Sequence, residues 1–210
     1  MSRLVRLALV VIALAVAGSA AAGPRDPNER HTAAGQAIAR RAVLRPSDFS
    51  PGWRRVSRKG RPVRCRSYNP DLSRLTRIGL ARSVFSFRRR SEIGSSVSVF
   101  LEPRQAATAF RVGPTRAFLT CAATHFAKGL AKYGPVRETL RRMTPGPPLG
   151  VPSRTFRWGY RLRWHGRSLA YRYDTIVFLA DRAIATVWFW CVGGPCRYET
   201  GTVRIVASRL

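Results

Sequence analysis

The chain has 210 residues and a formal net charge of +28, with 38 basic residues against 10 acidic ones. Hydrophobic residues make up 45% of it, which is enough for a packed core and excludes general disorder. Only three of the basic residues are lysines (Lys59, Lys128 and Lys132), so 35 are arginines (38 − 3). A GC-rich genome would explain that ratio, but not the shortage of acids.

Residues 1–22 predict a secretory signal peptide. Arg3 and Arg6 precede an apolar run at 7–17, and three alanines at 20–22 form a small-residue cleavage site. A retained membrane anchor is the alternative, but the run is shorter than the roughly 20 apolar residues of a spanning helix. We therefore expect a secreted, extracytoplasmic protein that is cleaved near Ala22. That location disfavours nucleic acid as a partner and favours disulfide bonds.

After a flexible leader at 23–29, we expect a single α+β domain over residues 30–210. Residues 30–44 predict a helix that Pro46 ends. Residues 81–88 and 95–101 alternate between apolar and polar side chains, which predicts a hairpin with its loop around 90–94. Pro103 suits the first turn of a long helix, which Gly113-Pro114 should kink or split.

The second half of the chain is mostly strand in this interpretation. Residues 136–143 predict one strand, and residues 154–164, 168–180 and 183–191 predict an antiparallel meander of three long strands. Residues 198–210 close the chain as a helix. The order α-β-β-α-β-β-β-β-α predicts an α+β fold in which helices flank an antiparallel sheet, an α/β/α sandwich.

Two-residue turns at His165-Gly166 and Asp181-Arg182 would fix the register of the meander. A loop of three residues would mix the two faces, because a slip of one residue moves every side chain to the other face. The pairs that follow include Tyr160 with Tyr171, Trp158 with Tyr173, Arg157 with Asp174, Thr175 with Trp188, and Tyr173 with Trp190.

One face of the meander is aromatic throughout. We expect this face to be core packed under helices. The alternative is a carbohydrate- or lipid-binding platform, because the polar tips of tyrosine and tryptophan need a partner or water. The residues concerned are Trp158, Tyr160, Tyr173, Trp188 and Trp190.

The other face is split. Near the second turn it is apolar, with Ile176, Phe178, Val187 and Phe189. Near the first turn it is cationic, with Arg157, Arg161, Arg163 and Arg172, and only Asp174 is available to neutralise them. Because burying unpaired charge is costly, this end should be open to water. It is either a solvated face of an arginine-rich protein or an anion site for phosphates or carboxylates of envelope polymers.

The sequence lacks the motifs that several kinds of catalysis and metal binding require. There is no G-x-S-x-G motif, no phosphate-binding loop and no close pair of acids, and the three histidines (His31, His125 and His165) are scattered. The four cysteines have no matching histidine pair, which disfavours zinc. We therefore expect no catalytic residue, no metal and no cofactor.

A set of short motifs resembles one family. The residues are Leu44, Asp48, Pro51-Gly52-Trp53, Cys65, and Val97-Ser98-Val99-Phe100 before a helix that carries Cys121. This pattern is similar to secreted actinobacterial sensor-type domains, such as the extracellular domain of the PknH-type serine/threonine kinase, which has a PsbP-like α/β/α sandwich. The resemblance covers about residues 30–210.

The resemblance implies two disulfides, because members often join the first cysteine to the second and the third to the fourth. Carried over, this gives Cys65–Cys121 and Cys191–Cys196. The chain departs from the kinase in having no kinase domain and no retained membrane span, and its second cysteine pair is unusually close. Signalling to a kinase therefore does not carry over, whereas a ligand-binding cleft does.

Three functions follow as hypotheses. We favour a secreted, non-catalytic ligand-binding or sensor-type domain of unknown ligand. The first alternative is an arginine-rich binder of anionic envelope polymers, and the second is a hydrolase of unrecognised type. The expected partner is a small-molecule or polymeric anionic ligand, with association at the envelope surface, and the expected oligomeric state is a monomer.

Overall fold

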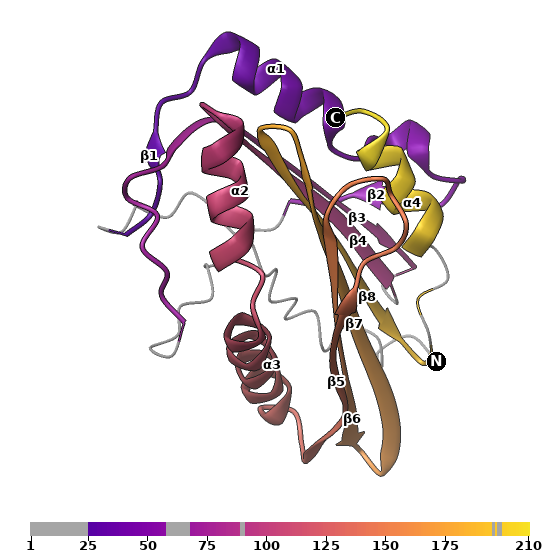
Figure 1. The fold of residues 1–210 in the computed structure, drawn as a ribbon. Helices are drawn as coiled ribbons and strands as arrows, with labels where there is room; N and C mark the ends of the chain where they lie inside the picture. Colours follow the sequence, from indigo (N-terminus) through magenta and orange to yellow (C-terminus); the bar gives the residue numbers. More distant parts are fainter. Residues whose placement is uncertain (1–24, 58–67, 89–90, 195, 197–198) are drawn as a thin grey trace.

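The computed structural model describes residues 25–57, 68–88, 91–194, 196 and 199–210 (Figure 1). The expected signal peptide and Cys65 lie outside the described residues. In chain order the elements are β1 (Asn28–Glu29), α1 (Ala33–Ala42), the 3-10 helix η1 (Pro46–Asp48), β2 (Trp53–Arg55), β3 (Thr76–Phe87), β4 (Ser91–Phe100), α2 (Pro103–Val112), α3 (Arg116–Ala131), β5 (Val136–Pro145), β6 (Ser153–Trp164), β7 (Arg167–Ala180), β8 (Ala183–Val192) and α4 (Glu199–Ala207).

The strands form one open sheet of eight strands in the order β1-β3-β4-β8-β7-β6-β5, and β2 pairs with β3 beside this path. All pairs are antiparallel except β1 with β3. Antiparallel strands with helices inserted between them are typical of the α+β class. The predicted fold class is therefore confirmed.

Helices cover both faces of the sheet, which makes three layers (Figure 1). On one face, α2 and α3 pack on the aromatic residues: Ala106 of α2 and Phe126 of α3 belong to the same buried cluster as Trp158. On the other face, α1 and α4 pack on aliphatic and phenylalanine side chains, so that Ala39 and Val203 share a second cluster.

The register of the meander is as predicted from the two-residue turns. Strand β6 pairs with β7 so that Tyr160 lies opposite Tyr171 and Arg157 opposite Asp174, and β7 pairs with β8 so that Thr175 lies opposite Trp188. His165 and Gly166 have φ of 46° and 73°, the left-handed backbone that a tight hairpin turn of this kind requires.

The long helix predicted after Pro103 is split, as Gly113-Pro114 indicated. Helix α2 ends at Val112, and the side chain of Thr115 caps α3 by accepting a hydrogen bond of 3.3 Å from the backbone N–H of Phe118. A proline cannot donate the backbone hydrogen bond of a helix interior, so the chain begins a second helix.

One loop was predicted wrongly. The hairpin loop expected around 90–94 is shorter, because β4 already begins at Ser91 and Gly94 pairs with both Val84 and Trp188. Glycine is typical of loops, but a Cβ built on Gly94 would lie 2.0 Å from Cζ2 of Trp188. The glycine is therefore inside the sheet, where it leaves room for the indole ring.

Two short strands were not predicted. Asn28 and Glu29, expected within a flexible leader, pair with Thr76 and Arg77 as β1, and Trp53–Arg55 pair with the end of β3 as β2. Glu29 also accepts a hydrogen bond of 3.1 Å from Nε of buried Arg77. Strands of two or three residues are too short to show a periodicity of two.

Candidate functional site

The aromatic face is closed. Trp158, Tyr173 and Trp188 are 0% exposed, and Tyr160 and Trp190 are buried with them. The rings of Trp158 and Tyr173 stack with centroids 4.6 Å apart. The hydroxyl of Tyr160 donates a hydrogen bond of 2.6 Å to the carbonyl of Ala123 on α3, and burial raises the pKa of this phenol. These five residues are therefore core, and the structure does not place a binding platform there.

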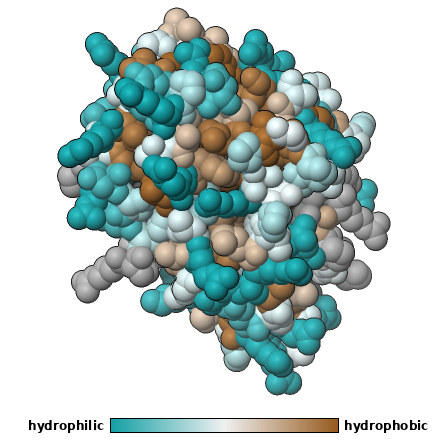
Figure 2. Space-filling model, viewed as in Figure 1, coloured by the Kyte–Doolittle hydropathy of each residue, from teal (hydrophilic) through white to brown (hydrophobic). Residues whose placement is uncertain are grey.

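The four predicted arginines lie together on the opposite face. Arg157, Arg161 and Arg163 alternate along β6, and Arg172 on β7 lies opposite Gly159. Arg161 and Arg163 are exposed, whereas Arg157 and Arg172 are half-buried. On this face α1 packs on β3 and β4, and α4 packs on β8, so the arginines lie beyond both helices. Figure 2 shows that hydrophilic side chains also gather over the end of the molecule that holds the β6–β7 turn.

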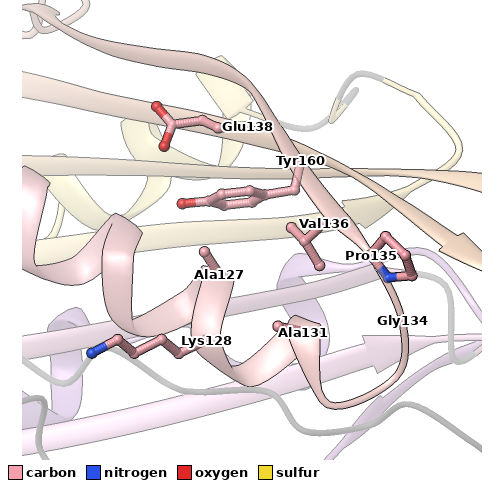
Figure 3. A pocket seen from close by; sticks show the side chains of 8 residues that line it. All are labelled: Ala127, Lys128, Ala131, Gly134, Pro135, Val136, Glu138 and Tyr160. Carbon is pink, nitrogen blue, oxygen red and sulfur yellow. The ribbon is translucent and has the colours of Figure 1, made fainter.

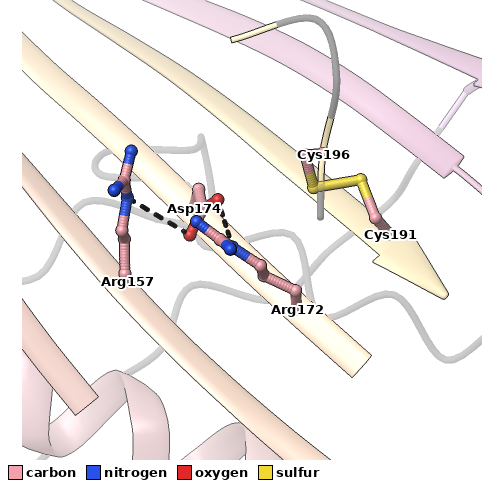
Figure 4. Close-up of a disulfide and its surroundings, with 5 residues drawn as sticks. All are labelled: Arg157, Arg172, Asp174, Cys191 and Cys196. Atoms are coloured by element: carbon pink, nitrogen blue, oxygen red, sulfur yellow. Dashed lines mark hydrogen bonds and ion pairs between the residues drawn. A yellow bond between two sulfur atoms is a disulfide. The ribbon is translucent and has the colours of Figure 1, made fainter. Parts of the chain in front are cut away.

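Asp174 is the acidic residue beneath these arginines. Its side chain is 0% exposed, and it accepts a hydrogen bond of 2.7 Å from Nε of Arg172 (Figure 4). The Nε of Arg157 approaches it from β6 at 3.8 Å. The cross-strand partner Arg157 was predicted from the register, but Arg172, two residues before Asp174 on the same strand, was not. The buried carboxylate therefore accepts a hydrogen bond from one guanidinium group and forms an ion pair with a second.

A β-bulge adds two arginines that the sequence analysis missed. Strand β5 contains one extra residue, Thr139, between Glu138 opposite Tyr160 and Leu140 opposite Gly159. As a result Arg137 lies opposite Arg161 and Arg142 lies opposite Arg157, although residues five apart on a regular strand point to opposite faces. Directly opposed residues of an antiparallel pair share a face. Six residues therefore define what we call the arginine surface: Arg137, Arg142, Arg157, Arg161, Arg163 and Arg172.

The charge of the arginine surface is strongly unbalanced. Six arginines and Asp174 give a formal charge of +5 (6 − 1). Within the described part of the chain, no ion pair joins Arg137, Arg142, Arg161 or Arg163 to an acid. Glu138, the nearest acid on β5, faces the other side of the sheet and pairs with Arg141 at 2.8 Å. Arg137, Arg142, Arg161 and Arg163 thus have no acidic ion-pair partner among the described residues.

A second feature is a hollow between the end of α3 and the start of β5. It has a volume of about 690 Å³ and is open to the surface. Its lining is mainly apolar, with Ala127, Ala131 and Val136, and its charged members are Lys128 and Glu138 (Figure 3). The ring of Tyr160 projects into it from β6. An open apolar hollow with one charge of each sign favours no particular ligand.

The Cys191–Cys196 disulfide predicted from the resemblance is present, with Cα atoms 5.7 Å apart. Cys191 lies opposite Arg172, so the bridge borders the arginine surface (Figure 4). Cys121 is buried on α3. Because Cys65 lies outside the described residues, the Cys65–Cys121 bridge stays a prediction.

The three histidines lie in different parts of the described chain. His125 and His165 are exposed, and His31 lies 2.8 Å from Glu29 near β1. Among the described residues no three His, Cys, Asp or Glu side chains are grouped so as to hold a metal ion. The described helices also include none long and apolar enough to span a membrane.

No protein-family model and no curated protein sequence matches the chain. Among solved structures it is similar to LpqN, described as involved in cell envelope biogenesis of Mycobacterium tuberculosis, with a TM-score of 0.31 and 11% sequence identity over 79% of this chain and 78% of that one. A likeness at this level assigns no function, and the resemblance to kinase sensor domains remains a prediction.

Proposed function

We propose that this protein is an extracytoplasmic, non-catalytic binding protein whose arginine surface holds anionic polymers of the cell envelope. The observation that carries the proposal is the collection of six arginines, four of them exposed, around one buried carboxylate, on a part of the sheet beyond the described helices. Guanidinium groups present planar forks of donors that suit phosphate and carboxylate oxygens. A sheet surface, unlike a pocket, can contact several repeats of a polymer at once.

The proposed location rests on two further features. The N-terminal sequence has the basic, apolar and small-residue regions of a signal peptide. The Cys191–Cys196 bridge is of the kind that persists in oxidising compartments. Both favour a place where envelope polymers, rather than nucleic acids, are the abundant polyanions.

The test is to change Arg157, Arg161 and Arg163 together to Gln and to measure retention on immobilised poly(glycerol phosphate) and on polygalacturonate, at low and high salt. We expect binding at low salt to weaken by up to about a hundredfold, since three charged contacts of up to about 1 kcal/mol each are lost. Salt should weaken the parent more than the variant, because fewer counterions are displaced by the variant.

The matched control changes Arg40, Arg111 and Arg116 to Gln. These three are exposed on α1, α2 and α3, and their replacement lowers the net charge by the same amount. The control should keep the affinity of the parent. If both variants weaken equally, the binding is a property of net charge and not of the arginine surface, and the proposal is wrong.

A second candidate is the small-molecule binding expected of a sensor-type domain, and the hollow beside α3 is the observation that favours it. The change Ala131→Trp would fill this hollow without altering the arginine surface. A library of small anionic and apolar metabolites, screened by thermal shift, should then stabilise the parent and not the variant. Compounds that stabilise both proteins equally would exclude the hollow as their site.

A further inference from the structure

The two edges of the sheet differ in how their backbone groups are satisfied. At one edge the outer side of β3 is occupied: β1 and β2 pair with its two ends, and between them the carbonyls of Ile78 and Val84 accept hydrogen bonds of 2.9 Å from the backbone N–H groups of Thr32 and Val56. At the other edge β5 is the last strand, and no second strand of the described chain pairs with it. An edge without a partner presents a row of N–H and C=O groups to which another strand can bind.

The ladder between β5 and β6 shows which backbone groups of β5 point outward. The N–H of Gly146 donates a hydrogen bond of 3.1 Å to the carbonyl of Ser153, so these two opposed residues form a hydrogen-bonded pair. Such pairs alternate along an antiparallel ladder, so Arg142 also turns its groups toward β6, whereas Arg141 and Met143 turn theirs away from it. No other backbone group of the described residues hydrogen-bonds to these two. Their N–H and C=O groups are therefore open to a further strand.

The same strand carries apolar surface on the side of α3. Seven of the ten residues of β5 are exposed, so the described helices leave its edge accessible. Met143 is 38% exposed, and it lies opposite the buried Phe156 and hence on the α3 side. The hollow lined by Ala131 and Val136 opens on that side at the other end of the strand (Figure 3). The α3 side of this edge thus offers apolar contacts at both ends.

The opposite side of the strand is cationic. Arg137 and Arg142 lie there, opposite Arg161 and Arg157 of β6. A strand added at the edge would lie about 5 Å from β5, and its side chains would alternate between the two sides. Acidic side chains would suit the arginine side, and apolar side chains would suit the α3 side.

We therefore infer that the outer edge of β5 binds an extended segment of another protein, in which acidic and apolar residues alternate, as an additional strand of the sheet. This goes beyond the binding of envelope polymers, because the free backbone groups are matched by a second peptide backbone. A second copy of this chain fits poorly, since two β5 strands side by side would bring arginines against arginines. The bulge at Thr139 and the proline at 145 also oppose indiscriminate pairing of the edge.

The probe is a synthetic peptide of about seven residues, a usual strand length, in which glutamate and valine alternate. A scrambled peptide places all the glutamates before the valines, and a third peptide keeps the alternation but carries N-methyl groups on its backbone nitrogens. Fluorescence anisotropy measures the affinity of each peptide for the mature protein at physiological salt. We expect the alternating peptide to bind at least about tenfold more tightly than either control, because each control loses several backbone hydrogen bonds. Its binding should also slow hydrogen exchange of the Arg141 and Met143 amides.

Met143→Pro tests the edge from the side of the protein. Proline has no backbone N–H, and at a position whose N–H points outward it leaves the ladder with β6 intact. Met143→Ala is the matched control, because it removes the same side chain and keeps the N–H. We expect Met143→Pro to bind the alternating peptide about fivefold more weakly than Met143→Ala, the effect of one hydrogen bond. If melting shows that Met143→Pro does not fold, the N-methylated peptide and the parent decide.

The outcomes separate this inference from the proposed function. Met143→Pro should keep the affinity of the parent for poly(glycerol phosphate), because no arginine is changed, so a loss of peptide binding alone concerns the edge. Absence of peptide binding, equal affinity for the alternating and scrambled peptides, or equal binding by Met143→Pro and Met143→Ala would overturn the inference. Sedimentation that finds the parent dimeric and Met143→Pro monomeric would overturn it too, because a second copy would then occupy the edge.

Discussion

The two faces of β6 and β7 are formed by alternate residues of the same two strands, yet they differ in chemistry and in exposure. On one face Trp158 and Tyr173 are stacked and covered by α3, and even the hydroxyl of Tyr160 is satisfied by Ala123. On the other face Arg161 and Arg163 are exposed beyond any covering helix. Toward the β6–β7 turn, one pair of strands thus supplies a closed core on one side and a charged surface on the other, whereas Ile176 and Phe178 of that second face belong to the other core cluster.

Each of the two faces contains a buried glycine. Gly94, on the aromatic side, is covered by the ring of Trp188, whose Cζ2 lies 2.0 Å from the place where a Cβ would stand. Gly159, on the arginine side, is also buried, and Thr139 Oγ1 lies 2.9 Å and Leu140 Cβ 3.4 Å from the place of a Cβ. The first glycine leaves room for an indole ring of the core, and the second leaves room for the extra residue of the β5 bulge. Substitutions should therefore change stability on the aromatic face and binding on the arginine surface.

The largest expected effect is on the aromatic face. Trp158→Ala or Trp188→Ala should lower the free energy of unfolding by about 3–5 kcal/mol, because each removes a fully buried indole. Trp164→Ala is the matched control on the same strand, and because Trp164 is only partly buried its cost should be smaller. Urea denaturation measures all three. A melting temperature unchanged from the parent in Trp158→Ala would contradict the assignment of this face to the core.

The cysteines offer a second comparison: the Cys191–Cys196 bridge borders the arginine surface, and Cys121 of the predicted Cys65–Cys121 bridge is buried on α3. A Cys65–Cys121 bridge would close a loop of 57 residues (121 − 65 + 1) and stabilise the fold by about 4 kcal/mol, whereas Cys191–Cys196 closes six residues and contributes about 2 kcal/mol. Replacing each pair by Ser and measuring the free energy of unfolding should therefore show the larger loss for the first pair. Non-reducing peptide mapping that joins Cys65 to Cys191 would refute this pairing.

Gly94→Ala is expected to have a smaller effect, of up to about 3 kcal/mol, because the new methyl group overpacks the core against Trp188. The double variant Gly94→Ala with Trp188→Leu should recover part of that loss, since the smaller side chain makes room. A double-mutant cycle by urea denaturation measures this coupling. Additive effects would mean that the glycine does not serve the ring.

The register of the meander could be predicted from two features: both turns have two residues, and one face is aromatic throughout. Only one alignment of the three strands satisfies both. The arginines of β6 and β7 followed from that register. Arg137 and Arg142 did not, because a bulge changes which residues of β5 share a face, and nothing in a periodic pattern reveals one extra residue. Gly94 was misplaced in a loop for a similar reason, since its role depends on Trp188, a residue 94 positions away (188 − 94).

The two helical layers that cover the sheet also differ in their contacts to carboxylates, so their stability should depend differently on pH. The layer on the side of the arginine surface is fastened by polar contacts: Arg209, after α4, donates a hydrogen bond of 2.8 Å to Asp48 of η1, and the backbone N–H of Arg45 donates another of 2.8 Å. Burial alone would raise the pKa of Asp48, but these hydrogen bonds and the charge of Arg209 outweigh it and lower the pKa. Both layers also have apolar packing, but the hydrogen bond from Tyr160 to Ala123 of α3 involves no carboxylate.

The smallest expected effect follows from that lowered pKa. The contribution of Asp48 is fully present above the pKa of the unfolded chain, ordinarily 3.8, and is lost as the pH falls through the lower pKa of the folded state. Asp48→Asn should therefore cost about 1 kcal/mol near neutral pH, and less as the solution becomes acidic. Asp181→Asn, at an exposed turn, is the control and should differ little from the parent at any pH. Urea denaturation gives these differences, and hydrogen exchange at acid pH should show α4 opening before α3. An Asp48→Asn penalty that stays constant with pH would mean that shape, and not the charge of the carboxylate, fastens this layer.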